Sequence, residues 1–288
     1  MSLKTSRLWS WSLVVGLGLV GCEAAPPPGM ESEATLGESA SAVVIPPITS
    51  FDWPPFANVT DVSLGSGHRT VAVGREQPFT LSTDYFVGPD ACIGCNNQLV
   101  FGVPGGTGAC AYDGVGPVQS HADIKLIAPK EPGVHPVHGN YTRAPDCAAA
   151  LASVGSGPAF GLIGVYVDPW DWSWGTISNL RLNGNSSHKI NVFPGARVNI
   201  TTDYKLDPAG GGCPSCWSQL VFGIDQGSKT CIYNGIGPTS ATNTTFSLIA
   251  PTQPGLYPVW AAPQWAFTCD QALSWSNGGT PVAFIEVK

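Results

Sequence analysis

The stretch CIGCNNQLVFG at residues 92–102 returns almost unchanged as CPSCWSQLVFG at residues 213–223. The two halves of the chain match along their length at an offset of about 120 residues, which is much longer than the 20–50 residues of solenoid and propeller repeats. Further matched pairs include CAYDGVGP at 110–117 with CIYNGIGP at 231–238, and LIAPKEPGVHPV at 126–137 with LIAPTQPGLYPV at 248–259. The sequence therefore predicts a tandem duplication of two domains, residues 51–168 and 169–288, each with its own core.

Within each repeat the spacing of apolar residues favours β-strands. Apolar side chains alternate with others at Val71 and Val73 and at Phe79 and Leu81, and turn signals such as Pro194-Gly195 separate these runs. The composition agrees, with 35 Gly, 26 Pro and few long stretches free of both. We therefore expect an all-β chain of two antiparallel β-sandwiches, although a jelly roll fits the same pattern.

The strand and turn pattern resembles that of immunoglobulin and fibronectin type III domains, which have about seven strands in a comparable length. In the second repeat, Tyr257 stands where a tyrosine corner is expected in such domains. His135 occupies the matching place in the first repeat. The resemblance is one of fold, and it implies no residue roles beyond this corner.

The amino terminus has the layout of a secretory signal. Lys4 and Arg7 precede a short apolar stretch, Leu13 to Val20, that is too short to cross a bilayer as a helix. The signal ends in Leu19-Val20-Gly21-Cys22, which resembles the lipobox of bacterial lipoproteins. That resemblance implies cleavage before Cys22, lipidation of Cys22 and anchoring in a membrane, with the remainder of the chain in the bacterial cell envelope at the outer membrane or cell surface.

Residues 23–50 are rich in Pro, Ala, Ser and Glu and nearly free of aromatic residues. Such a segment cannot bury enough apolar surface to offset the entropy of ordering, so it predicts a disordered tether. The formal net charge of −7 and a pI near 5.1 argue against nucleic acid as a main partner, because that role needs clustered Lys and Arg.

The chain has nine cysteines. With Cys22 assigned to the lipid, each repeat keeps four, an even number that predicts two disulfides per domain in an oxidising compartment. We expect each CxxC cysteine to pair with one of the two distal cysteines, and zinc or thioredoxin-like chemistry to be less favoured there. The eight residues are Cys92, Cys95, Cys110 and Cys147 in the first repeat and Cys213, Cys216, Cys231 and Cys269 in the second.

No catalytic motif for hydrolysis, nucleotide binding or metalloproteolysis occurs in the sequence, so we predict that the chain is not an enzyme and needs no cofactor. The polar residues shared by both repeats are interpreted as turn and core hydrogen-bonding groups: Asp84 and Asp203, Gln98 and Gln219, Tyr112 and Tyr233. His121, His135 and His138 of the first repeat have no histidine counterpart in the second. A copper or zinc site at these histidines stays open as a weaker alternative.

Tryptophan gives the most suggestive functional signal. Trp170, Trp172 and Trp174 crowd the segment between the repeats and are expected to pack between the two domains. Trp217, Trp260 and Trp265 are the candidate ligand-binding residues, since flat indole rings on a β-scaffold stack on sugars and also populate protein interfaces. Trp217 stands where the first repeat has Asn96, which indicates an exposed position.

These features predict a lipid-anchored, non-catalytic binding or adhesion module with carbohydrate as the favoured ligand. The alternative is a structural or accessory envelope lipoprotein that binds a protein partner.

Overall fold

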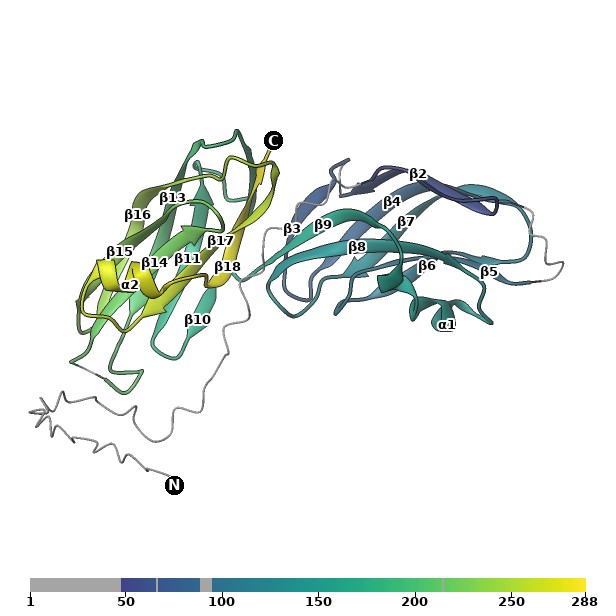
Figure 1. Cartoon of the computed structure of the whole chain (residues 1–288). Helices are drawn as coiled ribbons and strands as arrows, with labels where there is room; N and C mark the ends of the chain where they lie inside the picture. The colour runs from purple at the N-terminus through teal and green to yellow at the C-terminus, as the bar shows by residue number, and fades with distance from the viewer. Residues whose placement is uncertain (1–47, 66, 89–94, 214) are drawn as a thin grey trace, which may run out of the picture. The chain divides into compact units, whose positions relative to one another are not determined.

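The computed structural model describes residues 48–65, 67–88, 95–213 and 215–288 (Figure 1). The signal, Cys22, most of the tether and Cys92 lie outside the described residues. The first repeat consists of β1 (Phe51–Trp53), β2 (Ala57–Leu64), β3 (Thr70–Gly74), β4 (Pro78–Val87), β5 (Asn97–Gly102), β6 (Gly108–Gly114), β7 (Val118–Ile127), β8 (Gly133–Thr142), α1 (Cys147–Leu151), a 3₁₀ turn (Val154–Ser156) and β9 (Ala159–Tyr166).

The second repeat has the same elements in the same order apart from the 3₁₀ turn. They are β10 (Trp170–Trp172), β11 (Gly175–Leu182), β12 (Lys189–Val192), β13 (Arg197–Leu206), β14 (Trp217–Ile224), β15 (Lys229–Ile236), β16 (Thr239–Ile249), β17 (Gly255–Gln264), α2 (Cys269–Trp275) and β18 (Thr280–Val287). Neither helix is long and apolar enough to cross a membrane, and the same holds for every helix among the described residues.

Each repeat contains a four-stranded and a five-stranded sheet, and none of the four sheets in the described part of the chain mixes strands of both repeats. The strand orders are β1-β2-β4-β7 and β3-β9-β8-β5-β6 in the first repeat, and β10-β11-β13-β16 and β12-β18-β17-β14-β15 in the second. The pairings are antiparallel, as predicted, except that β3 pairs with β9 and β12 with β18 in parallel. The parallel pairs arise because the chain leaves the four-stranded sheet after β2 or β11 and joins the edge of the other sheet. This is an immunoglobulin-like sandwich, and the fold class is confirmed.

Alternation along the strands explains the core of each sandwich. In β4 the residues Phe79, Leu81, Tyr85 and Val87 are buried and point to one side, while the residues between them are more exposed. The first core contains these residues together with Leu99 and Phe101 of the repeated motif. Ile48, three residues before the predicted domain start at residue 51, also packs against this core.

The repeated QLVFG motif is buried on both faces of its strand, which explains why the two copies match best there. Leu220 and Phe222 of β14 face the core between the two sheets. Val221 faces the other way and packs with Ala272 of α2, and Val100 packs with Ala150 of α1 in the same manner. The two helices were not predicted from the sequence. Each has an amino-terminal cap, because the side chain of Asp146 accepts from the Ala149 amide and that of Thr268 from the Gln271 amide.

The disulfides correct the predicted connectivity. The structure joins Cys110 to Cys147, Cys231 to Cys269, and Cys213 to Cys216. The second repeat has an internal CxxC bridge in place of the predicted bridges to distal cysteines, because a turn brings the two Cα atoms to 5.4 Å. Each distal bridge instead fastens the first residue of a helix to an edge strand. Cys95 is also disulfide-bonded.

The corner predicted at Tyr257 is present, and histidine reproduces it in the first repeat. The hydroxyl of Tyr257 donates to the carbonyl oxygen of Gln253 at 3.0 Å. The Nε2 atom of His135 makes the equivalent bond to the carbonyl of Glu131 at 2.9 Å. Both bonds span four residues, so the two ring systems secure the same turn.

Trp170, Trp172 and Trp174 do not pack between the repeats as predicted. Trp174 belongs to the core of the second repeat, and Trp170 and Trp172 pack against that core. The reason is that β10 pairs with β11 of its own repeat, just as β1 pairs with β2. Apolar contacts between strands of the two repeats come instead from four other buried residues, Val134, Leu162, Leu256 and Phe284.

Candidate functional site

The three tryptophans predicted to bind a ligand lie in different environments. Trp217, the first residue of β14, is 40% exposed. Trp260 is only 4% exposed, because Val221, Ala262 and Ala272 pack around it beneath α2. A buried indole does not offer its ring faces to a ligand, so the prediction is corrected for Trp260.

Trp265 is half-buried and packs mainly within its own repeat. Its ring centroid lies 4.6 Å from that of Trp174. The glycine-rich turn before β14 closes over this pair, since a Cβ atom at Gly211 would lie 2.9 Å from the Trp174 ring and 3.1 Å from the Trp265 ring. Trp265 therefore contributes mainly packing beneath the surface, and only part of its side chain is available for contact with a ligand.

Strand pairing places two further apolar residues, which sequence reasoning missed, at the same end of the sheet as Trp217. Ile236 is the direct cross-strand partner of Trp217 and is 54% exposed. Phe267 is 74% exposed and follows Ala266, which is held to Gln219 of β14. We call the set Trp217, Ile236, Trp265 and Phe267 the aromatic end of the second repeat; Trp174 lies beneath Trp265 in the core.

A buried glutamine makes the aromatic end rigid. The Nε2 atom of Gln219 donates to the carbonyl of Ala266 at 2.7 Å, and its Oε1 atom accepts from the Ala266 amide at 2.7 Å. Gln219 is fully buried and also donates to the side chain of Asn234. Together with the Cys213–Cys216 bridge directly before Trp217, these bonds fix the backbone on both sides of the exposed indole.

The first repeat has the same scaffold without the aromatic residues. Gln98 makes the equivalent pair of hydrogen bonds to Ala144. The glutamine bonds of the two repeats therefore join matched residues. Asn96 stands in place of Trp217, and its side chain is held by Asp113 and the carbonyl of Pro145. Pro145 itself stands in place of Phe267. The difference between otherwise matched repeats was the signal that would have revealed Phe267 in the sequence.

The histidines proposed as a weaker metal site are engaged separately. His135 secures the corner described above, and burial lowers its pKa. The Nδ1 atom of His138 bonds to the carbonyl of Gly157 at 2.8 Å. Across the part of the chain that the structure describes, there is no group of three or more His, Cys, Asp or Glu residues able to hold a metal ion.

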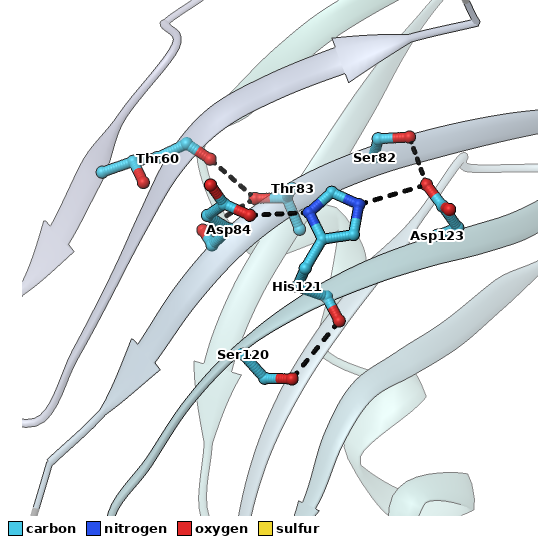
Figure 2. A network of polar contacts seen from close by, with 7 residues as sticks. All are labelled: Thr60, Ser82, Thr83, Asp84, Ser120, His121 and Asp123. Atoms are coloured by element: carbon cyan, nitrogen blue, oxygen red, sulfur yellow. Dashed lines mark hydrogen bonds and ion pairs between the residues drawn. The ribbon is translucent and has the colours of Figure 1, made fainter.

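The third histidine lies in a polar network on the outer face of β4 and β7 (Figure 2). The Nδ1 atom of His121 lies 2.6 Å from Oδ1 of Asp84, and its Nε2 atom lies 3.4 Å from Oδ1 of Asp123. Ser82 donates to Asp123 rather than to the imidazole. Since both ring nitrogens face carboxylates, His121 cannot accept the Ser82 proton, and the cluster lacks the arrangement of a nucleophile with its base.

This network predicts a pH-dependent contribution to stability. Hydrogen bonding to Asp84, reinforced by Asp123, raises the pKa of His121 above 6.5, while the hydrogen bond from Ser82 lowers the pKa of Asp123 below 3.8. The histidine contribution is therefore complete below pH 6.5 and is lost as the pH rises through the raised pKa. The aspartate contribution is present above pH 3.8 and is lost as the pH falls through the lowered pKa.

We accordingly expect the His121→Gln variant to lose stability relative to the parent at pH 5.5 but to match it at pH 8.5. Chemical denaturation at the two pH values measures this difference. Both groups are exposed, so the effect is small. An equal loss at both pH values would show that the imidazole contributes through packing rather than charge.

No family model and no curated protein matches this chain. Among solved structures the chain is similar to the D0-D1 domain of intimin, with 15% identity over 78% of this chain and 98% of that chain and a TM-score of 0.25. It is also similar to the Yersinia pseudotuberculosis adhesin InvE, with 11% identity over 79% of this chain and a TM-score of 0.25. The chain spans 59% of the InvE chain. Likenesses at this level do not decide function, and the fold assignment rests on the strand pairing described above.

Proposed function

We propose that this chain is an exported, lipid-anchored and non-catalytic adhesion module whose contact surface is the aromatic end of the second repeat. The observation that carries the proposal is the placement of Trp217. Its indole is partly exposed on a strand that is braced by a buried glutamine and a disulfide, and the first repeat has no aromatic residue there. A rigid exposed indole loses little conformational entropy on binding, which is why such residues are enriched at recognition surfaces.

The favoured ligand class is carbohydrate. An indole face stacks on the apolar face of a sugar ring, and the exposed amide of Asn234, two residues from Ile236 on β15, adds a hydrogen-bonding group beside it. Exposed Ile236 and Phe267 favour a second candidate, an envelope protein with an apolar contact patch. Both candidate ligands would bind the aromatic end. They are distinguished by whether the protein retains a polysaccharide or an envelope protein.

Binding is tested with the full-length chain, purified from membranes in mild detergent, on a panel of soluble and insoluble polysaccharides. We expect Trp217→Ala to weaken retention by about tenfold or more, as truncation of a central aromatic contact does. Trp275→Ala is the matched control, because Trp275 is also exposed in the second repeat but lies at the last residue of α2. An equal effect of both variants would contradict a localised site.

Retention by an envelope protein, with no retention on any polysaccharide, would reject the carbohydrate proposal in favour of the second candidate. Crosslinking in intact cells identifies such a protein if the crosslink is lost in the Trp217→Ala variant. Loss of the crosslink in the Trp275→Ala variant as well would reject the site itself.

The membrane anchor is proposed from the sequence and has its own test. We expect Cys22→Ser to abolish incorporation of labelled palmitate and to release the protein from the membrane fraction, because the thioether to the lipid forms on the cysteine sulfur. Fractionation of cells that express the parent and the variant measures both. A variant that stays membrane-bound and labelled would contradict lipidation at Cys22.

A further inference from the structure

The surface around the aromatic end is nearly free of charge. Residues 208–224 and 230–269 contain no Asp, Glu, Lys, Arg or His. These stretches supply β14, nearly all of β15, the whole of β16 and β17, and the turn that packs on Trp174. Such long uncharged stretches are notable in a chain whose overall composition is 11% charged, because they include exposed strand positions as well as the core.

Comparison with the first repeat shows that the fold does not require this neutrality. At matched positions of the two repeats, a charged residue in the first is replaced by an uncharged one in the second: Asp113 by Asn234, Asp123 by Thr245, Lys125 by Ser247, Lys130 by Thr252, Glu131 by Gln253 and Arg143 by Trp265. The backbone frame is retained across these changes, including the glutamine bonds to Ala144 and Ala266. The fold therefore tolerates charged residues at these positions, and their absence from the second repeat is not required by its strand pairing.

The cations of the second repeat lie away from Trp217 in the strand register, and Arg181 of β11 and Arg197 of β13 belong to the four-stranded sheet. Lys229 is at the opposite end of β15 and donates to the carbonyl of Ser276. Lys189 and Lys288 face Glu286. Lys205 is the cation nearest the aromatic end in the sheet register, but it projects from the outer face of the four-stranded sheet, whereas Trp217 lies on the five-stranded sheet.

One exposed carboxylate, in contrast, is close in sequence to the aromatic end. Asp270, in the first turn of α2, comes three residues after Phe267 and is exposed. A polymer that carries carboxylate, sulfate or phosphate would meet this group, and residues 208–224 and 230–269 supply no cation to compensate it. A neutral sugar would meet ring faces and an amide.

We propose that the aromatic end of the second repeat binds an uncharged polysaccharide and discriminates against acidic ones. The inference rests on the proposed adhesion function and specifies its ligand. Trp217 supplies the stacking face, Ile236 and Phe267 flank it, and the discrimination comes from the absence of cations in the surrounding strands.

The test compares neutral and acidic polymers on the full-length chain at low and high salt. Soluble β-glucan, xyloglucan and galactomannan represent the neutral class, and alginate, polygalacturonate and hyaluronate the acidic class. We expect the affinity for a neutral polymer to change by less than about twofold between 20 and 500 mM NaCl, and acidic polymers to bind at least about tenfold more weakly at either salt concentration. Tight binding of acidic polymers that is lost in high salt would overturn the inference while leaving the adhesion function in place. No binding to either class would reject the proposed function as well.

A pair of variants tests the electrostatic cause directly. Ile236→Lys places a cation opposite Trp217, and Ile236→Gln removes the same apolar side chain without adding charge. We expect both variants to weaken binding of the neutral polymer to the same extent, because both remove the apolar side chain opposite Trp217, and Ile236→Lys alone to acquire salt-dependent binding to acidic polymers. Equal behaviour of the two variants toward acidic polymers would overturn the explanation.

Discussion

Replacing Cys231 and Cys269 together by alanine lowers the free energy of unfolding of the second repeat by about 4 kcal/mol. The bridge closes a loop of 38 residues, and in the chain-entropy model closing such a loop removes that amount of freedom from the unfolded state. The same bridge holds the first residue of α2 against β15, where Cys231 and Ala272 contribute to one apolar cluster. Denaturant unfolding monitored by tryptophan fluorescence measures the loss.

The Cys213→Ala/Cys216→Ala variant is the matched control. Its bridge spans only three residues, so the same model gives a loss of about 1.6 kcal/mol. We expect the loss from the distal bridge to exceed that from the CxxC bridge clearly. The reverse order would mean that the CxxC turn, and not the fastening of α2, limits the stability of the second repeat.

Changing Trp260 to alanine lowers the free energy of unfolding by about 3–5 kcal/mol, as truncation of a large buried aromatic residue does. Trp260 is 4% exposed and fills the space between β17 and α2, where Val221, Ala262, Ala266 and Ala272 surround it. Its ring also lies directly above Gly223, at which a Cβ atom would come within 2.2 Å. No smaller side chain fills this volume.

Trp217→Ala is the control for this second prediction, because it removes the same side chain from an exposed position. We expect it to cost less than about 1 kcal/mol, consistent with substitutions at the surface. Thermal and denaturant unfolding of both variants therefore separate the tryptophan that stabilises the fold from the one assigned to binding. A loss of similar size in both would place Trp217 in the core network and weaken the proposed site.

Much of the fold was accessible from the sequence because it depends on local chemistry. The match between residues 92–102 and 213–223 predicted the duplication, and alternation in β4 and β13 predicted strands with one buried face. Tyr257 was correctly placed at a corner. The helices that begin at Cys147 and Cys269 were not predicted, because segments of five and seven residues are too short for a clear helical period.

The candidate site was predicted only in part. The exposure of Trp217 followed from its replacement by Asn96 in the matched repeat. Ile236 became visible only through its cross-strand pairing with Trp217, and Phe267 through the glutamine bond that holds Ala266 beside β14. Contacts of this kind join residues 19 to 47 positions apart, beyond the reach of local patterns.

The sequence by itself determined the duplication, the all-β character, the even distribution of cysteines between the repeats and the uncharged stretches of the second repeat, because each depends on composition or local spacing. Only the tertiary structure decided which cysteines pair and which tryptophans reach the surface. Trp217, Trp260 and Trp265 are alike in chemistry, but α2 is fastened over the sheet by Cys231–Cys269 and covers Trp260. The turn before β14 packs on Trp265. Trp217 is covered neither by this turn nor by α2, and it is 40% exposed.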